Sequence, residues 1–167
     1  MRKQAGFTLI ELIACIVILG VIGIGTATVI SLGARGFFNA RNADNAGVSA
    51  QIALERIAIE LRDANGGPGG AIQVTASPVS ISYTTSKTEL PGTRTLAFSG
   101  GAITLTPTSG GTAYTLLGGV STCAMSSSGT GRASTLTVSF TMTDAPAGEV
   151  FRITVKPRGN TATPVNS

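Results

Sequence analysis

The chain has 167 residues, of which only 12% are charged, and it contains no histidine or tryptophan. This length fits one domain with an appended segment, and the low charge content argues against a highly charged disordered chain and a nucleic-acid-binding protein. The formal net charge of +4 includes Arg2 and Lys3, so the residues after Gly6 carry only +2 and predict no strongly electrostatic partner.

A short basic segment, which holds Arg2 and Lys3, precedes an apolar run from Phe7 to Leu32 whose only charge is Glu11. The run has 26 residues, and about 20 suffice to cross a bilayer. One interpretation is a secretory signal peptide cut near residues 25–27, and the other is a retained membrane helix. Retention is favoured by the length, because a signal-peptide core has about 7–15 residues. It is also favoured by Glu11, because burying a carboxylate costs about 2.5–3.5 kcal/mol and therefore needs a reason in the mature protein.

Orientation is marked only weakly by charge. Arg2 and Lys3 precede the apolar run and favour a cytoplasmic N-terminus, but Arg35 and Arg41 follow the run closely.

Helical periodicity continues beyond the membrane-length run. One helix face is predicted to be buried because apolar residues recur every three or four positions at Ala46, Ala50, Ala53 or Leu54, Ile57 and Leu61. Charged residues occupy the opposite face: Glu55, Arg56, Glu60, Arg62 and Asp63. Arg56 and Glu60 are spaced to pair, and the Gly-Pro-rich run at 66–70 ends the helix.

After Gly70 the apolar period changes to two, which predicts half-buried antiparallel strands. These strands are centred on residues 79–83, 96–98, 103–105, 114–116, 136–142 and 151–155. Gly100-Gly101 predicts a two-residue hairpin turn, and residues 144–148 separate the last two strands. We expect a surface loop at 122–134 and a frayed tail from Gly159. The apolar face of the sheet needs a cover, and the helix at 46–64 is the segment available.

These elements predict an α+β fold in which a long N-terminal helix, membrane-spanning in its first half, packs on an antiparallel β-sheet.

Chemical sites are scarce in this sequence. The lack of histidine excludes a His-based metal site or a Ser-His triad, and the glycine-rich runs at 66–70 and 129–132 lack the ending of a phosphate loop. Glu55 and Glu60 are predicted on an exposed helix face, and Asp144 and Glu149 are predicted to be solvated acids beside a turn. We therefore predict no enzyme, no cofactor and no metal site.

The two cysteines, Cys15 and Cys123, are predicted to be free. The helix after Cys15 would hold it about 30 Å from residues beyond the membrane, whereas a disulfide needs Cα atoms within about 7 Å.

The stretch Gly6-Phe7-Thr8-Leu9-Ile10-Glu11-Leu12 closely resembles the processing site of type IV pilins and pseudopilins. The resemblance implies that a prepilin peptidase on the cytoplasmic side cuts after Gly6 and methylates the new N-terminal residue, Phe7. It also implies that Glu11, with Thr8 beside it, serves subunit assembly by pairing with the N-terminal ammonium of a neighbouring subunit. Such a pair would make the buried carboxylate tolerable.

The resemblance covers the leader and about the first thirty mature residues, and residues 54–64 resemble the second helical half of minor pilins. Gly20 falls where such pilins often have a glycine that loosens the helix. Thr28 stands where many type IVa pilins have proline, and the usual C-terminal cysteine pair is missing. These departures favour a minor pilin or pseudopilin.

The expected organisation has five parts, which are a leader (1–6), a transmembrane and filament-core helix (7–34), an amphipathic second half of the helix (35–65), an antiparallel β domain (71–158) and a C-terminal tail (159–167). We expect a bacterial inner-membrane protein whose globular domain lies outside the cytoplasm. Its partners would be the prepilin peptidase, other subunits and an inner-membrane assembly platform of a type IV pilus or type II secretion machine. The alternatives are a signal-anchored periplasmic binding module that never assembles and, less favoured, a secreted β-rich protein.

Overall fold

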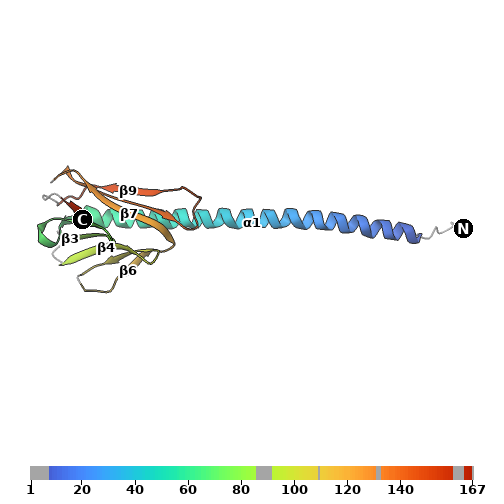
Figure 1. Ribbon diagram of the computed structural model, residues 1–167, viewed down its shortest axis with the longest axis horizontal. Coiled ribbons are helices and arrows are strands. Elements are labelled where there is room, and N and C mark those ends of the chain that lie inside the picture. Colours follow the sequence, from blue (N-terminus) through green and yellow to red (C-terminus); the bar gives the residue numbers. More distant parts are fainter. Residues whose placement is uncertain (1–7, 86–91, 109, 131–132, 160–163, 167) are drawn as a thin grey trace. The chain divides into compact units, whose positions relative to one another are not determined.

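The computed structural model describes residues 8–85, 92–108, 110–130, 133–159 and 164–166 (Figure 1). The chain divides into two compact units, Met1–Arg41 and Asn42–Ser167. One helix, α1 (Leu9–Arg62), contributes to both units. Within the first unit every described side chain from Thr8 to Arg41 is exposed, so this part of α1 makes no core of its own.

The second unit contains two β-sheets in place of the single sheet that the sequence predicted. The larger has the strand order β10-β2-β3-β4-β5-β6, with β1 beside β3, and the smaller has the order β7-β8-β9. The strands of the larger sheet are β1 (Ala64–Gly66), β2 (Gln73–Ala76), β3 (Val79–Thr85), β4 (Thr93–Ser99), β5 (Ala102–Thr106), β6 (Tyr114–Leu117) and β10 (Val165–Asn166). Those of the smaller sheet are β7 (Val120–Ser128), β8 (Thr135–Met142) and β9 (Phe151–Val155). A 3₁₀ turn, η1 (Pro68–Gly70), follows β1.

Among the described strands, every pair is antiparallel except β10 with β2, which is parallel. The predicted α+β class, with a long helix packed on antiparallel-rich sheet, is confirmed.

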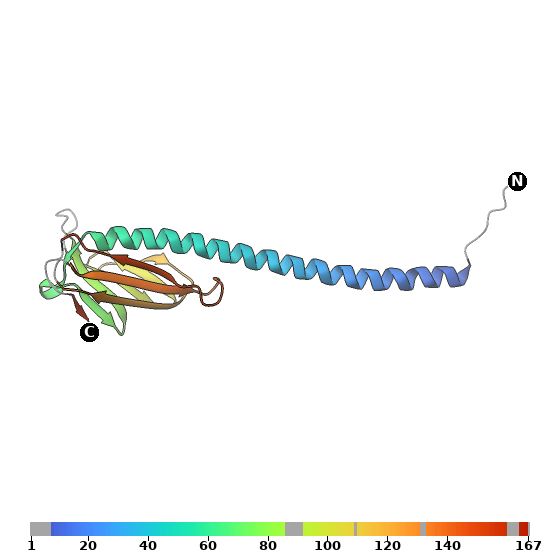
Figure 2. The same ribbon diagram turned by 90° about the horizontal axis from the view of Figure 1, so that it is seen from above.

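The second half of α1 packs on the sheets through the face that its periodicity predicted, and Figure 2 shows this part of the helix lying along the strands. Ala50, Ile57 and Leu61 are fully buried, and Ala46 and Ala53 are nearly so. Alanines on this face allow the helix backbone to approach the sheets closely, while Ile57 and Leu61 fill the space between them. A single core cluster therefore contains residues of α1 and of both sheets.

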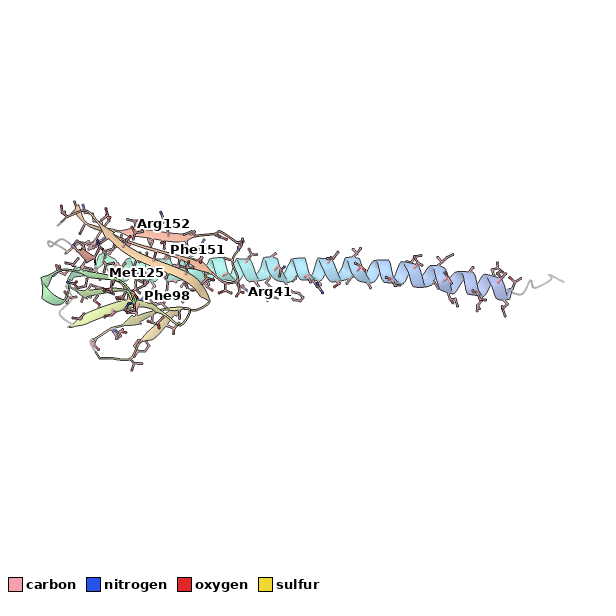
Figure 3. The ribbon with its side chains drawn as sticks, in the orientation of Figure 1. Arg41, Phe98, Met125, Phe151 and Arg152 are labelled. Carbon is pink, nitrogen blue, oxygen red and sulfur yellow. The ribbon has the colours of Figure 1, made fainter. Side chains whose placement is uncertain are left out.

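Both sheets contribute apolar side chains to that cluster. Met125 of β7 belongs to it and Phe98 of β4 packs against it (Figure 3). In the smaller sheet Phe140 stacks on Phe151, with ring centroids 5.7 Å apart. Along β8 the buried residues Leu136, Val138 and Phe140 alternate with half-buried ones, as a side-chain period of two predicts.

The hairpin predicted at Gly100-Gly101 is confirmed. Ser99 pairs with Ala102, and the two glycines have φ of 58° and 74°. Both angles lie in the left-handed region that a two-residue type I′ turn requires and that glycine enters without a Cβ clash.

Besides β1 and β2, which the sequence did not predict, three segments differ from the sequence-based expectation. Residues 122–128 were expected in a surface loop, but they belong to β7, which pairs along its length with β8. Serine and threonine dominate this strand, so its apolar alternation is too weak to read, yet backbone pairing to β8 holds it in place. The tail from Gly159 was expected to be frayed, but Val165 and Asn166 form β10 against β2.

The third difference concerns β6. Its alternation predicted that Tyr114 and Leu116 face inward, but Tyr114 is 61% exposed and Leu117 is 5% exposed. The register between β5 and β6 shifts after the pair Ile103 and Leu117, as at a β-bulge. One extra residue in a strand reverses which side chains face the core, because the side-chain period is two.

Candidate functional site

The first candidate site is the start of α1. The Thr8 carbonyl accepts hydrogen bonds from the backbone N–H groups of Glu11, at 3.1 Å, and Leu12, at 3.3 Å. Glu11 Oε2 lies 3.4 Å from both the backbone nitrogen and the hydroxyl of Thr8 and accepts from each. This is the glutamate half of a capping box, in which the third helical residue reaches back to the capping residue. Thr8 and Glu11 therefore come together, and Gly6 and Phe7 lie outside the described residues.

The apolar part of α1 is exposed throughout. Among the described residues, α1 is the one helix whose length and composition suffice to cross a membrane, and none of its most apolar stretch is buried. Leu9 is 80% exposed, and the other large apolar side chains up to Leu32 are exposed as well. Such a continuous apolar surface needs a lipid or protein cover, because water contact with it is unfavourable.

Threonine hydroxyls within this stretch form hydrogen bonds to backbone carbonyls of the same helix. The Thr26 hydroxyl lies 3.0 Å from both the Ile22 and Gly23 carbonyls, and the Thr28 hydroxyl donates to the Ile24 carbonyl at 3.0 Å. Bonds of this kind cover hydroxyl groups that hydrocarbon cannot solvate. Helix α1 runs without interruption through Gly20 and Thr28.

Aromatic and basic side chains follow the apolar stretch. Phe37 and Phe38 meet edge to face, with ring centroids 6.0 Å apart, and both are exposed. Arg35 and Arg41 flank them, and Arg41 is labelled in Figure 3. Arginines near the end of a membrane-length apolar stretch are typical of the boundary between a membrane and water.

The second candidate site is a buried charge cluster in the second unit, and it corrects the expectation that Glu60 lies on an exposed helix face. Glu60 is 9% exposed. Its Oε2 lies 2.9 Å from Nη2 of Arg94 on β4 and accepts a hydrogen bond from the Tyr83 hydroxyl at 3.2 Å. Its Oε1 lies 2.8 Å from Nη2 of Arg56, which confirms the predicted pairing along the helix.

This cluster ties α1 to β3 and β4. Tyr83 is fully buried, and burial raises its pKa well above the ordinary range, with the Glu60 charge adding to the rise. The Tyr83 hydroxyl therefore stays protonated and donates to Glu60. A buried carboxylate held by two arginines and a tyrosine is compensated, whereas any one of these groups alone would be costly to bury.

Sequence reasoning missed this cluster, although the signals were present. Glu60 lies three residues after Ile57, within the apolar stripe of α1, and Arg94 lies two residues before Leu96, in the inward phase of β4. Two opposite charges at inward positions of different elements were the available clue.

The remaining titratable candidates lie apart from both sites. Cys123 is half-buried on β7 opposite Phe140, and burial raises its pKa to about 11, so the thiol stays protonated. Asp144 and Glu149 are exposed, as is Glu55. In the described part of the chain, no three His, Cys, Asp or Glu side chains are grouped as metal ligands would be.

Comparison with known protein families identifies the N-terminal segment. Residues 1–27 match the prokaryotic N-terminal methylation motif, the signal of type IV pilin-like prepilins. The chain therefore carries a prepilin signal, as the resemblance of residues 6–12 implied. No curated protein and no solved structure matches the chain.

Proposed function

We propose that this protein is a minor pilin or pseudopilin, a structural subunit that polymerises through α1 into a type IV pilus or a type II secretion pseudopilus. The observation that carries the proposal is the prepilin signal at residues 1–27, joined to a helix whose apolar surface is exposed from Leu9 to Phe38. In the membrane, lipid covers this surface, and in a filament, the helices of other copies cover it.

The proposed assembly contact uses the geometry at the start of α1. Cleavage after Gly6 leaves Phe7 as the new N-terminal residue, with its ammonium one residue before Thr8. Glu11 accepts only at 3.4 Å from Thr8, at the long end of the hydrogen-bond range, so its carboxylate can exchange that contact for a charged one. The ammonium of a neighbouring copy is the partner we assign to it, and Thr8 orients the carboxylate until that partner arrives.

The proposed course begins with the prepilin peptidase, which cuts after Gly6 and methylates Phe7. The chain then stays in the inner membrane, single-pass, with residues 42–167 outside the cytoplasm, until an assembly platform adds it to the filament. Thr28 in place of a proline and the lone cysteine of the second unit support a minor subunit. Gly20 is proposed as the point where α1 loosens in the filament.

The decisive experiment compares Glu11→Ala with the matched control Glu55→Ala, which removes an exposed carboxylate from the same helix. We expect Glu11→Ala to be processed and inserted normally but to be absent from sheared filaments, while Glu55→Ala is incorporated at the native level. Normal incorporation of Glu11→Ala would contradict the assembly role of Glu11, whereas absence of the native protein from sheared filaments would support a membrane-anchored module that never assembles.

Mass spectrometry of the mature protein tests the processing step separately. A chain that begins at methylated Phe7 is expected. A chain that begins near Thr28 would show cleavage by signal peptidase and would contradict the proposal.

A further inference from the structure

A group of aromatic and basic side chains follows the apolar stretch of α1, and we call it the exit cluster. It consists of Arg35, Phe37, Phe38 and Arg41, whose side chains are all exposed. Phe37 is 64% exposed and Phe38 is 59% exposed, although both are large and apolar. The cluster belongs to the first unit, which ends at Arg41, and neither ring takes part in the core of the second unit.

The four side chains of the exit cluster share one side of the helix. Successive residues of an α-helix are turned by about 100°, because about 3.6 residues complete a turn. By this spacing Phe38 lies between the two arginines, and Phe37 lies next to Arg41. Small residues occupy the opposite side, at Gly33, Gly36 and Ala40. This part of α1 is therefore basic and aromatic on one side only.

Both arginines of the exit cluster can reach a partner outside the chain. Among the described residues neither Arg35 nor Arg41 forms a salt bridge, and both are exposed. Asp44 is the acidic residue closest to them in sequence, and it lies beyond the cluster, in the second unit. In the proposed orientation the two cations lie on the non-cytoplasmic side of the membrane, where basic residues are less frequent. Their presence there needs a reason.

The length of the apolar run brings the exit cluster to a membrane surface. Residues 7–32 would measure about 39 Å as a helix, whereas the hydrocarbon core of a bilayer is about 30 Å thick. A helix longer than the core is accommodated by tilting, which brings the end of the run, and Arg35 just beyond it, to the level of the headgroups. A tilted helix turns one side towards the membrane surface where it emerges, so a one-sided cluster suits this position.

Phospholipid can cover both residue types of the exit cluster at once. Guanidinium groups bind phosphate through two parallel hydrogen bonds, and their charge favours an anionic headgroup. Phenylalanine rings of an interfacial helix are buried at the boundary between headgroups and acyl chains. A soluble anion would pair with the arginines but would leave both rings in water.

We propose that Arg35, Phe37, Phe38 and Arg41 form a binding site for an anionic phospholipid of the leaflet that faces away from the cytoplasm. The arginines bind its phosphate, and the rings lie among the upper parts of its acyl chains. This inference rests on the single-pass membrane state proposed above, but it does not depend on assembly into a filament.

The test uses tryptophan fluorescence, because the chain has no tryptophan of its own. The full chain with Phe38→Trp is reconstituted in liposomes of phosphatidylcholine and phosphatidylglycerol. One lipid at a time carries bromine near the headgroup end of its acyl chains, where it quenches a tryptophan in contact with it. We expect both lipids to quench Phe38→Trp, and phosphatidylglycerol to quench it more strongly at equal mole fraction.

Two arginine variants assign this preference to the exit cluster. In the Phe38→Trp background, Arg35→Gln and Arg41→Gln are each expected to lower the preference for phosphatidylglycerol about fivefold, because each removes one cation at the membrane surface. Arg152→Gln removes an exposed arginine of the second unit, labelled in Figure 3, and is expected to change nothing. Inorganic phosphate, added at constant ionic strength, is expected to leave the preference unchanged.

A second tryptophan position separates the lipid site from the membrane span on which it rests. Val21→Trp lies within the apolar run and is expected to be quenched by bromine near the ends of the acyl chains. Quenching of Val21→Trp without quenching of Phe38→Trp would keep the span and overturn the lipid site. Absence of quenching at both positions would overturn the membrane span itself, and the lipid site with it.

Three further results would overturn the lipid site alone. These are equal quenching of Phe38→Trp by the two lipids, a preference that Arg35→Gln and Arg41→Gln both leave unchanged, and a preference that inorganic phosphate abolishes. The last result would identify the ligand as a free anion.

Discussion

The two halves of α1 differ in what covers them, although they form one uninterrupted helix. From Leu9 to Arg41 every side chain is exposed and most are apolar. From Asn42 to Arg62 the helix buries alanines, Ile57 and Leu61 on one face and exposes charges on the other. The first half depends on a cover from outside the chain, and the second half is covered by the chain's own sheets.

This difference shows that the continuity of a helix does not reveal what stabilises it. Most helical stability in proteins comes from packing of a buried face. In the second half that packing is intramolecular and can be measured on the isolated protein. In the first half it can come only from lipid or from other molecules, so mutations there should alter insertion or assembly and leave the unfolding of the second unit unchanged.

The largest expected effect on stability distinguishes the buried carboxylate of Glu60 from the exposed carboxylate of Glu55, both in the second half of α1. Glu60→Ala leaves Arg94 buried without its counter-charge and is expected to lower the free energy of unfolding by about 3–5 kcal/mol. Glu55→Ala removes an exposed carboxylate and is expected to stay within about 0.5 kcal/mol of the native protein. Both tyrosines, Tyr83 and Tyr114, lie in the second unit, so tyrosine fluorescence during urea unfolding reports this unit alone.

A second pair of variants compares the same residue type in the two halves. Ile57→Ala opens a cavity in the core and is expected to cost about 2–5 kcal/mol in the same unfolding measurement. Ile22→Ala, in the exposed apolar half, is expected to leave that unfolding free energy unchanged. A large loss for Ile22→Ala would show that the two halves are covered in the same way, contrary to our view.

Glycine-to-alanine substitutions should have opposite effects on stability in the β4–β5 turn and in the exposed half of α1. Gly101 has φ of 74° in the β4–β5 turn, so Gly101→Ala is expected to cost about 1–2 kcal/mol. Gly20 lies in regular helix and no atom lies within 4 Å of an added Cβ. Gly20→Ala should therefore stabilise α1 by about 1 kcal/mol, visible as slower amide hydrogen exchange around residue 20.

The smallest effect concerns Cys123. Its pKa of about 11 is raised from 9.0 by burial, so the folded state favours the protonated thiol. The stabilisation is complete below pH 9 and is lost as the pH rises from 9 towards 11, because the unfolded thiol ionises first. Cys123→Val should reduce the loss of stability between pH 9 and 10.

The same shift predicts low reactivity. In a Cys15→Ala background at pH 8, iodoacetamide should alkylate Cys123 about a hundredfold more slowly than a free cysteine, because the thiolate is the reacting form. Alkylation at the rate of a free thiol, with the chain still folded, would show that Cys123 is not held in the core.

The part of the fold that could be predicted from the sequence is the part that depends on local periodicity. The spacing of Ala50, Ile57 and Leu61 gave the buried helix face, and the alternation around Ile81 or Val138 gave the strands, because both depend on local periodicity. The bulge that turns Leu117 inward and the pairing of β7 depend on a neighbouring strand and leave little local signal. Glu60 and Arg94 are 34 positions apart in the numbering, so only the folded chain reveals that they pair.

The candidate sites divide similarly. The prepilin signal is a contiguous motif and was visible in residues 6–12. The charge cluster combines Glu60 of α1 with Tyr83 of β3 and Arg94 of β4. Glutamate and arginine are common on solvated helix faces. A sequence pattern alone assigns such charges to the surface, because that is where most of them lie.

The parallel strand β10 has a consequence for the order in which this protein can be completed. Until Asn166 has left the ribosome, the edge of β2 that β10 covers has no partner from that strand, and an open edge can pair with another chain. One edge of β2 therefore stays open until residues 165–166 have been made, after all the other strands of its sheet.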